Sequence, residues 1–412
     1  MTDSASKPST VDWRRNLAAL WFAEFTAIFG FSFAFPFLSI FISQDLGVHP
    51  GRDLDLWTAA SASASGLAMA IASPIWGVLG DRYGRKPMLI RSMLGGAITV
   101  GLIFFAQNPV QLVILRLAQG ATSGTVAAAT ALVAAETPRT RVGWALGVVT
   151  SAVALGGAIG PVVGGLAGSA FGLRLVFLGG GILLLISTVP VFLIVKESER
   201  RIIEGPRPST LALIRTRPGT VRALAVLVGA QGLVSAVQSA SQVLLVLKLI
   251  ETAGASAASA GAGFAFGAAG VSNSISAVGY TRLTRRFGYV PVTSTAAFLL
   301  AGTVGLLILA PNVVLVVLAI GLSGLLNGTI IPATASMIGL ETPAEAQSTV
   351  FGINASSVAF GFFIGPLIAG GVAATSGVST ALGVMAVIAL GLCALVAIGA
   401  REPARMEGTP NA

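Results

Sequence analysis

The sequence predicts an all-α membrane protein with twelve transmembrane helices, arranged as two bundles of six. Hydrophobic residues make up 54% of the 412 positions and charged residues only 10%, whereas a soluble domain carries roughly 25% charged residues. The mean hydropathy is +0.87. The apolar segments are long, rich in Gly and Ala, and lack the alternation that barrel strands show. Helices are therefore the structure that satisfies the backbone inside lipid.

Each predicted span has about the 20 mostly apolar residues that a membrane-crossing helix needs. The first follows Arg14 and Arg15 and is longer than the apolar core of a signal peptide, so we expect a span here and not a cleaved leader. The twelve segments are residues 17–42, 58–80, 88–106, 110–134, 142–168, 172–195, 221–247, 257–280, 290–309, 312–337, 348–374 and 378–400.

The two halves of the chain repeat each other. Glu136-Thr137-Pro138 recurs as Glu341-Thr342-Pro343, and Gly160-Pro161 recurs as Gly365-Pro366 at the same separation. Six spans is an even number, so both copies have the same orientation in the membrane. We expect a six-helix bundle over residues 1–195, a cytoplasmic linker over 196–220 and a second six-helix bundle over 221–412.

The positive charge is explained by topology. A net charge of +9 and a pI of 10.7 could indicate a nucleic-acid partner. However, nearly all Lys and Arg residues fall in the connections on one side of the predicted spans, with only Arg52, Arg174 and Lys248 on the other. Basic residues gather on the cytoplasmic side. We therefore expect a multi-pass protein with both termini in the cytoplasm, a lipid bilayer as its partner and no nucleic acid.

Several chemical functions are excluded by residue counts. The chain has one cysteine, Cys393, and one histidine, His49, so a disulfide, a Cys/His metal site and a His-dependent triad cannot form within it. It contains no phosphate-binding loop of the Walker type. We therefore expect no enzyme activity, no cofactor and no metal, and we expect an ion gradient to supply the energy.

The loop after the second span has a distinctive order, Gly77-Val78-Leu79-Gly80-Asp81-Arg82-Tyr83-Gly84-Arg85-Lys86-Pro87. Small residues permit close helix approach, Gly84 permits a tight turn, and an acid at the membrane edge needs a partner. The loop closely resembles the signature loop of the major facilitator superfamily. That resemblance implies a conformational latch, which holds one state, made of Gly77, Gly80, Asp81, Arg82, Gly84, Arg85 and Lys86. The alternative is a basic anchor with a turn.

The fifth span is rich in glycine at helical spacing. Gly156, Gly160 and Gly164 share one face, as in the small-xxx-small pattern that brings helix backbones together, and Pro161 favours a kink. With Gly165, this pattern resembles the fifth-span motif of drug-proton antiporters, which is associated with exporters. The alternative is helix packing with no bearing on the direction of transport.

Two charged residues lie well inside predicted spans, away from their ends, and are candidates for proton coupling. Arg116 and the following Gln119 resemble the fourth-span motif of the same antiporters, in which the arginine takes part in proton coupling. Glu24 is the only acid deep in a span, and an intramembrane carboxylate is by default a functional candidate. The alternatives are an Arg116 that reaches the membrane surface and a Glu24 that is satisfied by a neighbouring helix.

A central substrate cavity is predicted from aromatic and amide side chains. Phe31 and Phe35 share a face of the first span, Gln231 and Gln238 belong to a polar stripe of the seventh span, and Asn327 lies in the tenth. A polar stripe in lipid must face protein or water. With Gln119, these residues are the candidate cavity lining, although lipid-facing phenylalanines and hydrogen bonds between helices would give the same pattern.

The whole chain resembles the drug-proton antiporter group with twelve spans, and most closely bacterial multidrug exporters of the MdtG type. The resemblance is carried by residues 12–17, the signature loop, Ile114-Leu115-Arg116 and residues 143–147. It implies the major facilitator fold, an inner-membrane location and a monomer that exports small amphipathic or hydrophobic compounds in exchange for protons. The alternative is a narrow-specificity metabolite uniporter, importer or exporter of the same fold.

Overall fold

The computed structural model describes residues 12–138, 141–198, 219–342 and 347–402, and all regular elements in these residues are helices. The elements, in chain order, are α1 (Trp13–Ala34), η1 (Phe35–Phe37), α2 (Leu38–Gln44), α3 (Arg52–Tyr83), α4 (Arg85–Leu102), η2 (Ile103–Phe105), α5 (Pro109–Thr122), α6 (Thr125–Glu136), α7 (Val142–Phe171), α8 (Leu173–Leu193), α10 (Thr220–Phe287), α11 (Tyr289–Leu309), α12 (Val313–Glu341), α13 (Gln347–Ser376) and α14 (Val378–Gly399).

The helices make twelve passes. In the described residues, eleven helical stretches are long and apolar enough to cross a membrane. Some of these join two elements, since α1 continues through η1 into α2, and α5 continues into α6. The twelfth pass is the more polar second part of α10, which Gly254 separates from the first part by a non-helical backbone (φ 76°, ψ 160°). The predicted fold class is confirmed.

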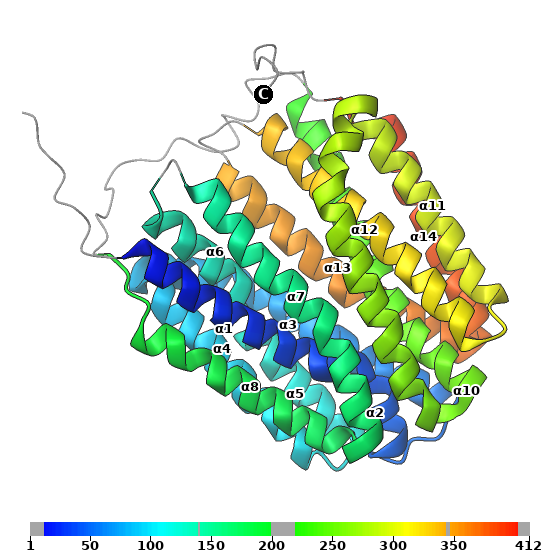
Figure 1. Cartoon of the computed structure of the whole chain (residues 1–412). Coiled ribbons are helices and arrows are strands. Elements are labelled where there is room, and N and C mark those ends of the chain that lie inside the picture. Colours follow the sequence, from blue (N-terminus) through cyan, green and yellow to red (C-terminus); the bar gives the residue numbers. More distant parts are fainter. Residues whose placement is uncertain (1–11, 139–140, 199–218, 343–346, 403–412) are drawn as a thin grey trace, which may run out of the picture.

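The passes form two bundles that lie side by side (Figure 1). In the first, α1 packs against α7 and α8, and α4 against α8. In the second, α10 packs against α12, α13 and α14, and α11 against α14. The face at which α1 begins and α14 ends is called the terminal face below. Most of the predicted linker, residues 199–218, lies outside the described residues.

The sequence repeat is also a repeat of helix contacts. A methyl group built on Gly156 would lie 2.9 Å from the Phe29 nitrogen of α1. At the matching place in the second half, a methyl group on Gly361 would lie 3.0 Å from the Ala236 nitrogen of α10. Glycine therefore allows the fifth helix of each bundle to touch the backbone of the first.

The two bundles touch each other near the face opposite the termini. There α3 packs against α13, and α7 against the second part of α10. A methyl group on Gly66 would lie 2.6 Å from the Phe363 nitrogen, and one on Gly263 would lie 2.6 Å from the Pro161 oxygen. These glycines are required where the bundles meet.

Toward the terminal face the same helices diverge. Gly77 continues the face of α3 that carries Gly66, and Gly352 continues the face of α13 that carries Phe363, yet a methyl group built on either would meet no atom within 4 Å. Residues on the same helices nearer the opposite face, such as Ala59 and Ala369, are buried. The structure is therefore a state that is closed at the opposite face and open at the terminal face.

Candidate functional site

A cavity of about 830 Å³ lies between the two bundles. Helices from both bundles contribute to its wall, including α1, α3, α5, α7, α10, α12 and α13. Aliphatic, phenylalanine, proline and glycine residues form most of this wall, with serine, glutamine and asparagine side chains among them, and Arg116 is the single charged residue among those that line it. A concave, mostly apolar surface with a few polar groups is typical of a small-molecule site.

Arg116 is held in this wall by a set of neutral partners. It lies in α5 and is 9% exposed. Its Nε donates to the Ser61 oxygen at 3.1 Å, its Nη2 donates to Ser65 Oγ at 2.7 Å, and its Nη1 donates to Gln119 Oε1. The guanidinium carbon lies 4.2 Å from the centroid of the Phe35 ring. Such contacts hold a charge that has left water without neutralising it.

Five of the six side chains that the sequence predicts for the cavity wall lie in it, and the sixth does not. Phe31, Phe35, Gln119, Gln238 and Asn327 all line the cavity. Phe31 and Phe35 stack with their ring centroids 6.0 Å apart.

Gln231 does not line the cavity. Its side chain is 2% exposed, and its Nε2 donates to the Ile331 oxygen at 2.9 Å, so it joins α10 to α12 inside the second bundle. Of the two readings that the polar stripe allowed, the structure supports hydrogen bonding between helices for Gln231 and a cavity position for Gln238.

Glu24 is fully buried in α1, with 0% exposure, and does not line the cavity. Among the described residues, neither of its carboxylate oxygens has a hydrogen-bond partner. No ion pair joins it to Arg116 in the same part of the chain. An ionised carboxylate in such a place would be costly, whereas a protonated one would not.

The predicted conformational latch lies at the terminal face. Gly84 has a φ of 100° and ends α3. The Nη1 atom of Arg85 donates to the Ala131 oxygen of α6, and the Nζ atom of Lys86 donates to the Phe192 oxygen of α8 at 3.1 Å. The loop therefore ties several helices of the first bundle together.

Other members of the latch make fewer contacts in this state. A methyl group built on Gly77 would meet no atom within 4 Å, and one on Gly80 would approach only Met88. The close helix approach expected at Gly77 is absent from this state, because the bundles diverge at this end. Arg82 is exposed beside Tyr83, and the side chain of Asp81 lies outside the described part of the chain.

Two glutamates that sequence reasoning missed cap the helices after these loops. Glu197 accepts from the backbone nitrogen of Lys86 at 2.9 Å, and Glu402 accepts from that of Val290, also at 2.9 Å. Each glutamate follows the last helix of its bundle and each capped helix follows a glycine with positive φ, Gly84 or Gly288. The two glutamates are separated by the same interval as Glu136 and Glu341, so the repeat was the signal that could have found them.

The fifth-span motif packs on two sides. Gly156, Gly160 and Gly164 contact the α1 backbone within the first bundle. A methyl group on Gly165 would lie 2.8 Å from the Ser259 oxygen of α10 in the second bundle, and the Pro161 oxygen approaches Gly263. Pro161 lies within α7, which continues as one helix from Val142 to Phe171. The motif thus sits where the bundles join at the opposite face.

A break in the fourth pass was not predicted. The helix stops at Thr122 and restarts at Thr125, and Gly124 has a φ of 125°. Trp76 Nε1 donates to the Ala121 oxygen at 2.6 Å, and Arg91 Nη2 donates to the Ser123 oxygen at 3.1 Å. Arg91 belongs to α4, within the predicted third span, and its guanidinium carbon lies 3.6 Å from the centroid of the Trp76 ring.

The family follows from comparison with known proteins. The sequence profile of the Major Facilitator Superfamily matches residues 20–288 and 227–412. The chain belongs to this superfamily. Its fold is that of superfamily transporters of known structure. The nucleoside transporter NupG superposes with a TM-score of 0.75 at 14% identity, covering 92% of this chain and 98% of NupG. A bacterial homologue of the human lysosomal transporter Spinster, solved inward-facing and unoccupied, gives 0.68 at 16% identity, covering 95% and 93%.

Sequence relatives within the superfamily match over about half of this chain's length. The multidrug resistance protein MdtG of Proteus mirabilis is 42% identical over 192 residues, 47% of this chain and 48% of MdtG. The multi-drug resistance efflux pump PmrA of Streptococcus pneumoniae is 38% identical over 187 residues, 45% of this chain and 46% of PmrA. The chain spans about half the length of the curated relatives it matches. The predicted family is confirmed, and the described helices make the chain a multi-pass membrane protein.

Proposed function

We propose that this protein is a secondary transporter that exports small amphipathic or hydrophobic compounds in exchange for protons. The observation that carries the proposal is the cavity of about 830 Å³ between the bundles, whose wall is aromatic and amide-rich with Arg116 as its single charged member. Such a wall accepts apolar bodies through Phe31 and Phe35 and orients polar groups through Gln119, Gln238 and Asn327. The names of the relatives MdtG and PmrA support multidrug export.

Alternating access would move substrate through this cavity. Two six-helix bundles that rock about a central site expose it to each side in turn. The present state is closed where Gly66 and Gly263 meet the other bundle and open at the terminal face. In the other state the terminal ends of α3 and α13 would meet, and the exposed Gly77 would then allow the close approach for which glycine is suited.

Coupling to protons would use Glu24 and Arg116. An unpartnered carboxylate in a dry site favours the protonated form, so Glu24 carries a proton in the present state and releases it when the other state hydrates the site. Arg116 lies in the cavity wall, where a bound substrate would change the contacts of its guanidinium group. For coupling, proton and substrate must each bind the two states with different affinity.

The distribution of basic residues supports a topology for this proposal. Lys and Arg residues gather in the connections at the terminal face, and this distribution favours cytoplasmic termini, for which the present state would be inward-facing. We place the protein in the inner membrane as a monomer, with bundles over 1–195 and 221–412 joined by a cytoplasmic linker, and with no enzyme activity.

Uptake into inside-out vesicles tests the proposal. A neutral, a cationic or an anionic fluorescent amphiphile is added outside vesicles that contain the protein, and a proton gradient, acidic inside, is imposed and then collapsed with a protonophore. We expect the neutral dye to accumulate only with both protein and gradient. Well-inserted protein that accumulates none of the three dyes would contradict multidrug export, and gradient-driven flux of a single metabolite would favour the narrow-specificity alternative.

A further inference from the structure

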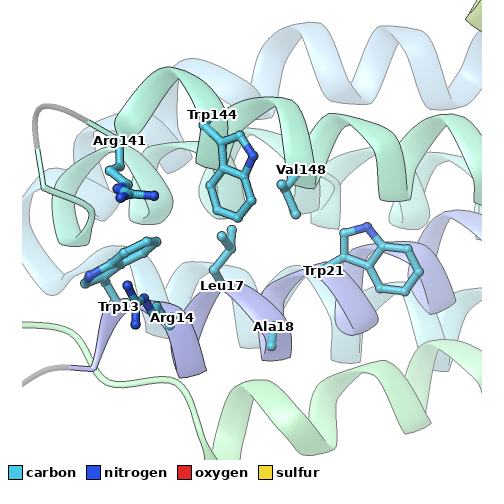
Figure 2. A pocket seen from close by; sticks show the side chains of 8 residues that line it. All are labelled: Trp13, Arg14, Leu17, Ala18, Trp21, Arg141, Trp144 and Val148. Carbon is cyan, nitrogen blue, oxygen red and sulfur yellow. The ribbon is translucent and has the colours of Figure 1, made fainter.

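A second hollow, of about 540 Å³, lies between the terminal-face ends of α1 and α7 and shares no residue with the central cavity. Trp13, Arg14, Leu17 and Trp21 line it from α1, and Trp144 and Val148 from α7, with Arg141 just before α7. It is called the α1–α7 groove below. Figure 2 shows Arg14, Arg141 and Trp13 at one end, Leu17 and Val148 in the middle, and Trp21 at the other end. The groove is therefore amphipathic along its length.

The apolar end of the groove continues onto a surface that faces away from the cavity. Trp144, Val148 and Leu155 recur at helical spacing on one face of α7, whereas the cavity-lining Val153 and Gly157 lie about half a turn away. Trp144 is 61% exposed and Leu155 is 45% exposed. In a membrane-spanning bundle, an exposed apolar stripe on the far side from the substrate path contacts lipid.

The basic end of the groove is not neutralised by the protein. Arg14 and Arg141 are both exposed, and within the described residues neither guanidinium lies within ion-pair distance of a carboxylate. The nearby Asp12 is occupied, since its Oδ1 accepts from the backbone nitrogens of Arg14 and Arg15 at 3.0 and 3.3 Å. Two guanidinium groups in reach of each other are suited to a phosphate, which accepts paired hydrogen bonds from arginine.

Two tryptophan contacts shape the groove. The Trp13 and Trp144 rings meet edge to face, with centroids 6.5 Å apart and planes at 89°. Trp21 Nε1 donates to Ser151 Oγ of α7 at 3.1 Å. From Trp13 to Trp21 the helix rises about 12 Å, which is the distance from a headgroup to the upper part of an acyl chain. Tryptophan is the residue that favours this depth.

We propose that the α1–α7 groove binds one anionic phospholipid of the leaflet at the terminal face. Its phosphate lies between Arg14 and Arg141, and an acyl chain follows Leu17, Val148 and Trp21. Basic pockets between helices at the membrane surface recognise anionic headgroups in this way. The proposal concerns a site outside the substrate path, so it stands whether or not the protein exports drugs.

Quenching of tryptophan fluorescence by brominated lipid tests the proposal. The full chain is placed in phosphatidylcholine nanodiscs containing either brominated phosphatidylglycerol or an equal amount of brominated phosphatidylcholine. Three of the five tryptophans, Trp13, Trp21 and Trp144, line the groove. We expect phosphatidylglycerol to quench at about thirtyfold lower mole fraction, since each basic group near the lipid surface contributes about fivefold.

Matched variants decide the outcome. Arg14→Gln/Arg141→Gln should lose the preference for phosphatidylglycerol. Arg15→Gln/Arg222→Gln removes the same charge from exposed positions outside the groove and should keep it. Equal quenching by both lipids in the unmodified protein, or equal loss in both double variants, would overturn the proposal. Reversal of quenching by soluble glycerol phosphate would also overturn it, because the site would then bind a free phosphate and not a lipid.

Discussion

The guanidinium carbon of Arg116 lies 4.2 Å from the centre of the Phe35 ring, so an aromatic side chain covers the single charge in the cavity wall. The ring comes from η1, just past α1, and the arginine comes from α5. Because Phe35 also stacks on Phe31, the contact joins the charged part of the wall to its apolar part. A substrate that displaces one of these rings would change the surroundings of Arg116, and under the proposed mechanism this would link binding to coupling.

Arg116→Lys should abolish most gradient-driven transport. Lysine keeps the charge but lacks the planar fork that reaches Ser61, Ser65 and Gln119 together. Losing charge-assisted hydrogen bonds of about 1.5–3 kcal/mol predicts at least a tenfold lower rate. The measurement is initial dye uptake in vesicles at matched protein amounts. Full activity in Arg116→Lys would show that only the charge matters and that the hydrogen bonds do not.

Glu24→Gln should leave the fold intact and remove proton coupling. The amide resembles the protonated carboxyl, which suits a fully buried site without partners, so we expect an unfolding temperature equal to or above that of the unmodified protein. Uptake against a gradient should be lost, while dye exchange without a gradient persists. Glu24→Asp, which keeps a titratable group, is the matched control. Gradient-driven uptake by Glu24→Gln would remove this residue from the coupling mechanism.

Glu197→Ala and Glu402→Ala should destabilise the two bundles by similar amounts. Each carboxylate accepts from two backbone nitrogens at the start of a helix, Glu197 at α4 and Glu402 at α11. Loss of a capping side chain costs about 0.5–2 kcal/mol. Thermal unfolding in detergent measures the effect. The unfolding temperature of Glu197→Gln, which retains an acceptor, should lie between those of Glu197→Ala and the unmodified protein. A harmless Glu402→Ala would show that the second cap is dispensable, although the repeat makes the two equivalent.

Arg174→Gln should make stability more dependent on pH. Arg174 Nε lies 3.4 Å from Asp45 Oδ1, and its Nη1 also donates to the Phe104 and Ala106 oxygens. Burial raises the pKa of the Asp45 carboxyl, and Arg174 partly opposes this rise. A carboxyl with a raised pKa favours folding at low pH, and that contribution is lost as pH rises through its folded-state value.

Without Arg174 the rise in the Asp45 pKa is unopposed, so the protein loses more folding stability as the pH rises. The variant should therefore fall further below the unmodified protein in unfolding temperature at pH 7 than at pH 4. The double variant Asp45→Asn/Arg174→Gln removes the titrating group, so its deficit should be no larger at pH 7 than at pH 4. An equal deficit at both values in the single variant would mean that the lost carbonyl contacts account for the whole effect.

The sequence predicted the passes well because length, apolarity and the positions of Lys and Arg all depend on the bilayer. It did not predict the break at Gly124, since residues 110–134 form one continuous predicted span and only the contacts of Trp76 and Arg91 reveal the break. Gln231 and Gln238 lie on one stripe, but only a structure shows which of them meets another helix and which meets the cavity. The glycine at position 77 predicted a close approach between helices. Whether this contact forms depends on the state of the two bundles, which the sequence does not show.

The central claim is that the bundles rock about the cavity, and the distance between their terminal ends tests it most directly. Spin labels on Val78→Cys in α3 and Ile353→Cys in α13, with Cys393→Ala, report this distance. Gly66→Ala pushes against the α13 backbone at the opposite face, so we predict a shift to shorter distances across the terminal face. Gly77→Ala meets nothing within 4 Å here and should not shorten them. One distribution, unchanged by Gly66→Ala, by substrate and by pH, would contradict alternating access.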